Sequence, residues 1–89
     1  MPYIKKERRK WLDEIVDTLW RKSPGNPGEL NYLVTRIIEH YACHSKAPLD
    51  YQKINDIMGA LEGAKLEFYR RVVAPYENSK IQSNGDVYE

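Results

Sequence analysis

The fold is decided by residues 61–75, LEGAKLEFYRRVVAP, because the spacing predicts one long helix with two apolar faces. At about 100° per residue, one face continues a stripe that begins near residue 54 and is expected to pack on a core. Its members are Ile54, Ile57, Met58, Leu61, Phe68 and Val72. The opposite face carries Gly59, Gly63, Leu66, Arg70 and Val73. Glycines that allow close backbone approach, beside aliphatic side chains and an arginine, predict an interface there with another subunit or a ligand.

Two further helices are expected upstream of this stretch. The apolar spacing predicts helices at about 5–22, 29–44 and 50–74. The segment SPGNPG, residues 23–28, breaks the pattern between the first two, since its prolines and glycines do not continue a helix. Asp50 is the expected N-cap of the third helix, and Pro75 is expected to end it. The prediction is an all-α fold, a small three-helix domain over residues 1–75 with a long third helix.

Residues 76–89 are expected to form a C-terminal arm or tail, because helical periodicity is lost there. The dipeptide Asn84-Gly85 favours a two-residue hairpin turn. A lone hairpin of this length is marginal in water. The segment is therefore either an arm that docks on its own or a neighbouring subunit, or a disordered tail.

The length and net charge of the chain limit which partners it is expected to bind and in which compartment it is expected to act. A chain of 89 residues is near the size at which one core barely offsets chain entropy, so a homo-oligomer is expected. The net charge of +1 gives no general attraction to nucleic acid, which is not an expected partner. No secretory signal and no membrane-spanning apolar run is visible, so no membrane partner is expected. With Cys43 as the one cysteine, these features predict a cytoplasmic protein.

Metal binding and catalysis are not expected. His40, Cys43 and His44 lie at i, i+3 and i+4, but the chain holds no other histidine or cysteine to complete a zinc site. A Cys-His pair on one helix also lacks a group to orient the base and donors for an oxyanion. These residues fit the margin of an amphipathic helix. The sequence therefore predicts a non-enzymatic protein with no metal and no cofactor.

A cationic and aromatic cluster on the third helix is the candidate ligand site. Arginine supplies a planar fork for phosphate, and tyrosine offers a ring face for a base. The predicted ligand-binding residues are Lys65, Tyr69, Arg70 and Arg71 on the third helix and Asn31, Tyr32 and Arg36 on the second. The alternative is an ordinary helix-helix contact, in which Arg70 or Arg71 pairs with Glu62 or Glu67 and the tyrosines cover the core.

Several sequence blocks resemble a known group of proteins. The blocks are MPYIKKERR (1–9), GELNY (28–32), YQKINDIMG (51–59), LEGAKLEFYRRVVAPYE (61–77) and NGDVY (84–88). They resemble a family of small uncharacterised proteins encoded by bacteriophages and bacteria. The resemblance implies a phage or prophage setting and no mechanism.

That setting resembles the one of small oligomeric phage proteins that act as sponges for nucleotide signals of bacterial immunity. The analogy implies an anti-defence protein that sequesters a phosphorylated nucleotide at a subunit boundary. Arg70 and Arg71 would contact phosphate, and Tyr32 or Tyr69 the base. The expected partners are the chain itself and a small nucleotide-derived ligand. The alternative is a protein-protein interaction module that binds a host or phage protein. Its interface residues are Gly59, Gly63, Leu66 and Val73.

Overall fold

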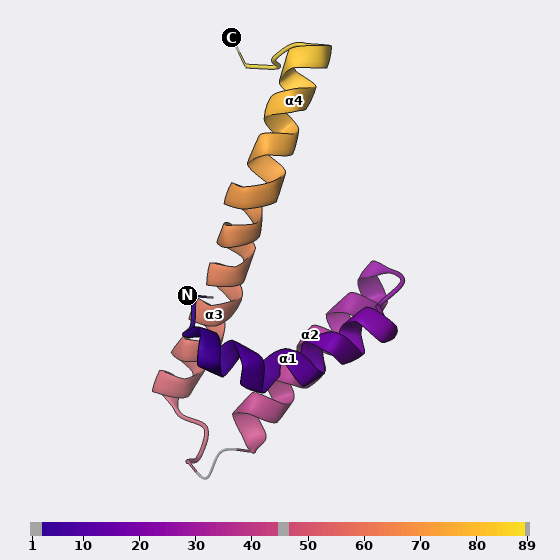
Figure 1. Ribbon diagram of the computed structural model, residues 1–89. Coiled ribbons are helices and arrows are strands. Elements are labelled where there is room, and N and C mark those ends of the chain that lie inside the picture. Colours follow the sequence, from indigo (N-terminus) through magenta and orange to yellow (C-terminus); the bar gives the residue numbers. More distant parts are fainter. Residues whose placement is uncertain (1–2, 45–46, 89) are drawn as a thin grey trace. The chain divides into compact units, whose positions relative to one another are not determined.

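The computed structural model describes residues 3–44 and 47–88, and these are all-α, as the sequence predicts (Figure 1). The elements are α1 (Lys6–Arg21), α2 (Pro27–Cys43), α3 (Tyr51–Phe68), the π-helical turn η1 (Tyr69–Val73) and α4 (Ala74–Asn84). Because α3, η1 and α4 follow one another without a break, they form a third helix of 34 residues. No strand occurs in the described ranges.

The chain divides into two compact units. The first unit is residues 3–57, which contain α1, α2 and the beginning of α3. The described part of the second unit is residues 58–88, which contain the rest of α3, then η1, α4 and the residues after it. The second unit therefore consists of one run of helix with a short C-terminal extension.

The start of α2 lies inside the segment that was expected to be a loop. Asn26 is the N-cap, and its Oδ1 accepts a hydrogen bond of 2.9 Å from the backbone N–H of Glu29. Pro27 occupies the first helical turn, where its missing N–H is not needed. Glu29 Oε1 accepts in turn from the backbone N–H of Gly25 at 2.7 Å. This reciprocal arrangement resembles a capping box, and it starts α2 two residues before the predicted position.

Helices α1 and α2 are joined by a short loop (Figure 1) and share one apolar groove. The helix residues that line it are Val16, Leu19, Trp20, Leu30, Leu33, Val34 and Ile37. Leu33 and Val34 are half-buried, whereas Trp20 is 82% exposed. None of the described residues is fully buried. The apolar stripes predicted from the spacing are present, but they form only a partial core.

The third helix begins as predicted and ends later than predicted. Asp50 Oδ1 accepts a 2.8 Å hydrogen bond from the backbone N–H of Lys53, which confirms the N-cap. Pro75 does not end the helix. The backbone N–H of Ala74 bonds to the carbonyl of Tyr69, five residues back, in the π turn. Proline lacks an N–H, and its ring clashes with the carbonyl four residues earlier in a regular α-helix. The wider π turn accommodates that ring, and the helix continues.

The helix ends at Asn84, inside the segment that was expected to be an arm or tail with a possible Asn-Gly turn. Gly85 has a φ of 86° and donates its N–H to the carbonyl of Ile81 at 2.8 Å. A glycine with positive φ is a common way to stop a helix. Asn84-Gly85 is therefore a helix C-terminus, and residues 76–84 are helical. Beyond it, the backbone N–H of Tyr88 donates to Asp86 Oδ1 at 2.9 Å.

The helix of the second unit carries large apolar side chains that no other element of this unit covers. They are Met58, Leu66, Phe68, Val72 and Tyr76, all of them exposed. An amphipathic helix normally buries such a stripe against another element. Within residues 58–88 no other helix is present to do so. Homo-oligomer assembly stays a prediction at this point.

None of the helices in the two described ranges combines the length and apolar composition that crossing a bilayer requires.

Candidate functional site

The predicted cationic cluster lies at the π turn. Tyr69, Arg70 and Arg71 are its first three residues, and Lys65 precedes them by one helical turn. Lys65 and Tyr69 line the same surface groove, together with Leu66, Phe68 and Val73. Wide helical turns of this kind are frequent at functional sites. The structure thus brings Lys65 and Tyr69 together in one groove, which Arg70 and Arg71 of the same segment do not line.

The cations of this segment are paired with carboxylates of their own helix. Arg70 Nη2 lies 2.6 Å from Glu67 Oε1, and Arg71 Nη1 lies 3.9 Å from the same oxygen. Lys65 Nζ lies 3.6 Å from Glu62 Oε1. The pairing with Glu67 that was expected is confirmed, whereas the helix-helix contact of which it was to be part stays a prediction. An exposed helix pair such as that of Lys65 with Glu62 contributes only about 0.3–0.5 kcal/mol, so it is readily exchanged for a stronger partner.

Tyr69 is linked to the far side of the π turn. A side-chain hydrogen bond with Glu77 raises the pKa of Tyr69 above its usual value, and the negative charge of Glu77 adds to the effect. In a regular α-helix two residues eight positions apart differ by about 80° around the axis. The extra residue in the π turn removes most of that difference. The π turn therefore places Tyr69 and Glu77 on one face.

The other predicted ligand residues belong to α2, in the first unit. Asn31 Oδ1 accepts a hydrogen bond of 3.3 Å from Thr35 Oγ1. Arg36 Nε lies 3.5 Å from Glu39 Oε1 in an exposed ion pair. Tyr32 lines a pocket beside the start of the helix. The seven predicted residues thus form two groups, one in each unit.

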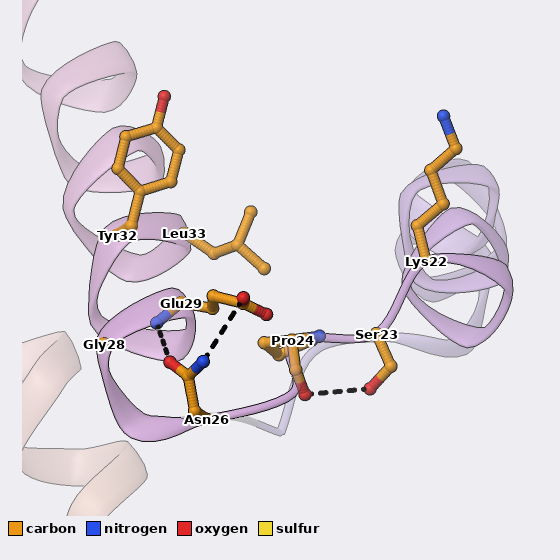
Figure 2. A pocket seen from close by; sticks show the side chains of 8 residues that line it. All are labelled: Lys22, Ser23, Pro24, Asn26, Gly28, Glu29, Tyr32 and Leu33. Atoms are coloured by element: carbon orange, nitrogen blue, oxygen red, sulfur yellow. Dashed lines mark hydrogen bonds between the residues drawn. The ribbon is translucent and has the colours of Figure 1, made fainter.

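The pocket beside Tyr32 was not predicted. Figure 2 shows Tyr32 and Lys22 on its two sides, with Leu33 between them. At its base, Asn26 Nδ2 lies 3.3 Å from Glu29 Oε2. The carboxylate of Glu29 thus occupies the start of α2, where a helix otherwise attracts an anion. These contacts are those of a helix cap. The residues N-P-G-E at 26–29 are the sequence signal for this cap.

The predicted interface residues lie on α3 and η1, in the second unit. A Cβ atom added at Gly59 would meet no other atom within 4 Å. Gly63 is half-buried, Leu66 is exposed and Val73 is half-buried. Leu66 and Val73 line the groove beside Tyr69. Nothing within the described chain uses the clearance at Gly59, and the interface stays a prediction.

The histidines of α2 stack on each other. The ring centroids of His40 and His44 are 3.9 Å apart, with an interplanar angle of 19°. Cys43 is exposed. Within residues 3–44 and 47–88, no group of three or more His, Cys, Asp or Glu side chains is arranged to hold a metal ion.

A protein-family model matches almost the whole chain. The family model described as "Domain of unknown function (DUF6899)" matches residues 1–87. The chain belongs to the DUF6899 family. No curated protein and no solved structure matches it. The match includes both helical units, so the groove at the π turn lies within the DUF6899 domain. The description of DUF6899 assigns no activity, and the function has to be argued from the surface of the chain itself.

Proposed function

We propose that this DUF6899 chain is a non-enzymatic protein-interaction module whose long third helix packs against another polypeptide. The observation that supports it is the exposure of apolar side chains along the second unit, such as Phe68, which is 60% exposed. Burying one large apolar side chain contributes about 1.5–3 kcal/mol. The whole stability of a small domain is about 5–15 kcal/mol. Covering Met58, Leu66, Phe68 and Val72 is therefore a large driving force for association.

The lengths of the helices argue for a partner outside the chain. At 1.5 Å per residue, α1 and α2 are each about 25 Å long, whereas the third helix is about 51 Å long. A short loop joins α1 to α2, and both line one groove, so the two helices lie beside each other. Each of them is only about half as long as the third helix, so neither is long enough to cover its full length.

Hydrogen-deuterium exchange of the full chain, measured over a dilution series, tests this role. Amides of residues 58–84 should be protected when the chain is associated and should exchange faster as native mass spectrometry shows dissociation. Phe68→Ala should weaken the association, and Ala60→Ser, a change without loss of apolar bulk, should serve as the matched control. A monomer whose residues 58–84 are fully protected at every concentration would refute the role, because the chain itself would then cover the helix.

A second candidate function is the sequestration of a phosphorylated nucleotide. It is favoured by the groove that Lys65 and Tyr69 share and by the two arginines that converge on one carboxylate. Arg70 and Arg71 of one subunit would exchange Glu67 for phosphate, and the exposed ring of Tyr69 from a second subunit would stack on the base. The ligand would be bound at a subunit boundary without any chemical step.

Calorimetric titration separates this candidate from the first. Cyclic dinucleotides and ADP-ribose derivatives are the probes. The double variant Arg70→Gln and Arg71→Gln should lose binding while its helicity, measured by circular dichroism, is retained. Lys10→Gln removes a positive charge from α1 and is the matched control. Equal affinity of the wild type and the double variant would refute a phosphate site at the π turn.

A further inference from the structure

One face of the third helix carries charges whose order would place opposite charges together if the same face of a second copy ran antiparallel to it. Its residues are Glu62, Lys65, Tyr69, Val73, Glu77 and Lys80. Three contacts connect them: Glu62 with Lys65 at 3.6 Å, the groove shared by Lys65, Tyr69 and Val73, and the hydrogen bond between Tyr69 and Glu77. Lys80 follows Glu77 by three residues, so it lies on the same side of α4. The charges read minus, plus, then minus, plus, with Tyr69 and Val73 between the two pairs.

We infer that the partner of this face is the same face of a second copy of the chain, packed antiparallel about a two-fold axis at Arg71. This inference rests on the proposed interaction role and specifies its partner. In this register Glu62 lies opposite Lys80 of the second copy, and Lys65 lies opposite Glu77. Tyr69 lies opposite Val73 at the centre. A two-fold contact repeats each pairing, so opposite charges meet at four positions.

In this register Arg71 and its copy, the like charges nearest to the two-fold axis, lie outside the contact. Arg71 pairs with Glu67, and both lie about 150–170° around the helix from the self-complementary face. A parallel arrangement in the same register would instead place each charge against its own copy, which is unfavourable. Antiparallel packing also opposes the two helix dipoles. The apolar centre supplies the contact area, because the groove beside Tyr69 includes Leu66, Phe68 and Val73.

The contacts that these charges make within one chain are weak enough to rearrange. The side chains of Lys65 and Glu62 are 74% and 55% exposed, and their ion pair is of the solvent-screened kind. Lys80 Nζ lies 5.4 Å from the ring centroid of Tyr76, in an exposed cation-π contact. Glu77 accepts one hydrogen bond from Tyr69, and a carboxylate has room for a further donor.

Charge reversal and rescue test the register on the full chain. The variants are Glu62→Lys and Lys80→Glu, each of which places like charges opposite each other twice in a homodimer. By sedimentation equilibrium, each variant alone should dissociate about tenfold more readily than the wild type. An equimolar mixture of the two should regain wild-type affinity, because opposite charges meet again in the mixed dimer. Ser79→Lys adds a positive charge on the opposite side of α4 and should leave the dissociation constant unchanged.

The outcomes separate this inference from the proposed role. Self-association that the variants do not weaken, or that their mixture does not restore, would overturn the register and leave the interaction role standing. A wild-type monomer with rapidly exchanging amides in residues 58–84 would overturn the second copy as partner, while the exposed surface stays available to another protein. A monomer with those amides protected would overturn both. Circular dichroism of each variant confirms that the helix is intact.

Discussion

Tyr69 and Glu77 form a side-chain hydrogen bond across the π turn although eight residues separate them. A regular α-helix would rotate the two side chains about 80° apart. Pro75 lies between them, and the π turn that precedes it supplies the missing rotation. A backbone irregularity thus fixes the face on which the proposed antiparallel contact depends.

The Tyr69–Glu77 hydrogen bond predicts one contribution to the loss of stability at alkaline pH, to be read as the difference between the wild type and variants that lack it. The pKa of Tyr69 is raised in the folded chain relative to about 10 in the unfolded chain, so the folded state binds its proton more tightly. This contribution is fully present below pH 10 and disappears as the pH rises through the raised pKa. Tyr69→Phe should reduce the alkaline decline in unfolding temperature, followed by circular dichroism. Glu77→Gln should have the same effect, and a decline as large as that of the wild type in both variants would contradict the assignment.

The cap of α2 predicts a measurable loss when it is removed. Asn26→Ala deletes the acceptor for the backbone N–H of Glu29 and should lower the free energy of unfolding by about 1 kcal/mol. Asn26→Ser keeps a capping oxygen and should lose much less. Asn78→Ala changes the same residue type at an exposed interior position of α4 and is the control, in which a small gain in stability is expected from the higher helix propensity of alanine. Urea unfolding curves of the three variants decide the matter, and equal midpoints for Asn26→Ala and Asn26→Ser would exclude the cap.

Local signals explain which features of the fold were predictable. Asp50 was recognised as an N-cap because capping depends only on residues within one helical turn. Pro75 was misread as a helix end because the usual rule assumes hydrogen bonds from residue i to residue i−4. The hydrogen bond from the N–H of Ala74 to the carbonyl of Tyr69 spans five residues, so the rule does not apply here. Asn84-Gly85 was misread for a related reason, since the same dipeptide serves a hairpin turn and a helix end.

In the candidate site, too, only the contacts between residues within one helical turn could be predicted from the sequence. The pairing of Arg70 and Arg71 with Glu67 follows from spacings of three and four residues on one helix. Periodicity likewise finds the apolar stripe that includes Phe68. It does not tell whether the side chains that cover the stripe come from the same chain or from another. The link between Tyr69 and Glu77 needed the π turn, for which the sequence offers only Pro75 as a signal.

Gly59 gives a prediction whose sign depends on the interface. In the isolated chain Gly59→Ala should stabilise the third helix by about 0.5–1 kcal/mol, because alanine has the higher helix propensity and its Cβ meets no atom within 4 Å. If a second polypeptide approaches the backbone there, the added methyl group should weaken association instead. Thermal unfolding and sedimentation equilibrium of the same variant measure the two effects. Ala60→Gly, one position along, is the matched reverse change and should destabilise the helix.

Pro75→Ala should convert the π turn into regular α-helix. Alanine supplies the N–H that Pro75 lacks, so position 75 can bond to the carbonyl of Arg71, and the ring clash disappears. The helix should become more stable, by up to about 3 kcal/mol if the wide turn relieves none of the strain of proline. Tyr69 and Glu77 should then rotate apart, and the pKa of Tyr69 should fall towards its ordinary value.

Ultraviolet titration of tyrosinate in Pro75→Ala, compared with Tyr69→Phe to isolate the signal of Tyr69, measures this change. The self-complementary face depends on the same rotation, because Glu77 and Lys80 lie after the π turn and Glu62 and Lys65 lie before it. The variant should therefore form a more stable helix and a weaker antiparallel dimer, a combination that a simple gain in helix propensity does not produce. A raised pKa of Tyr69 that survives the substitution would show that the π turn does not depend on Pro75.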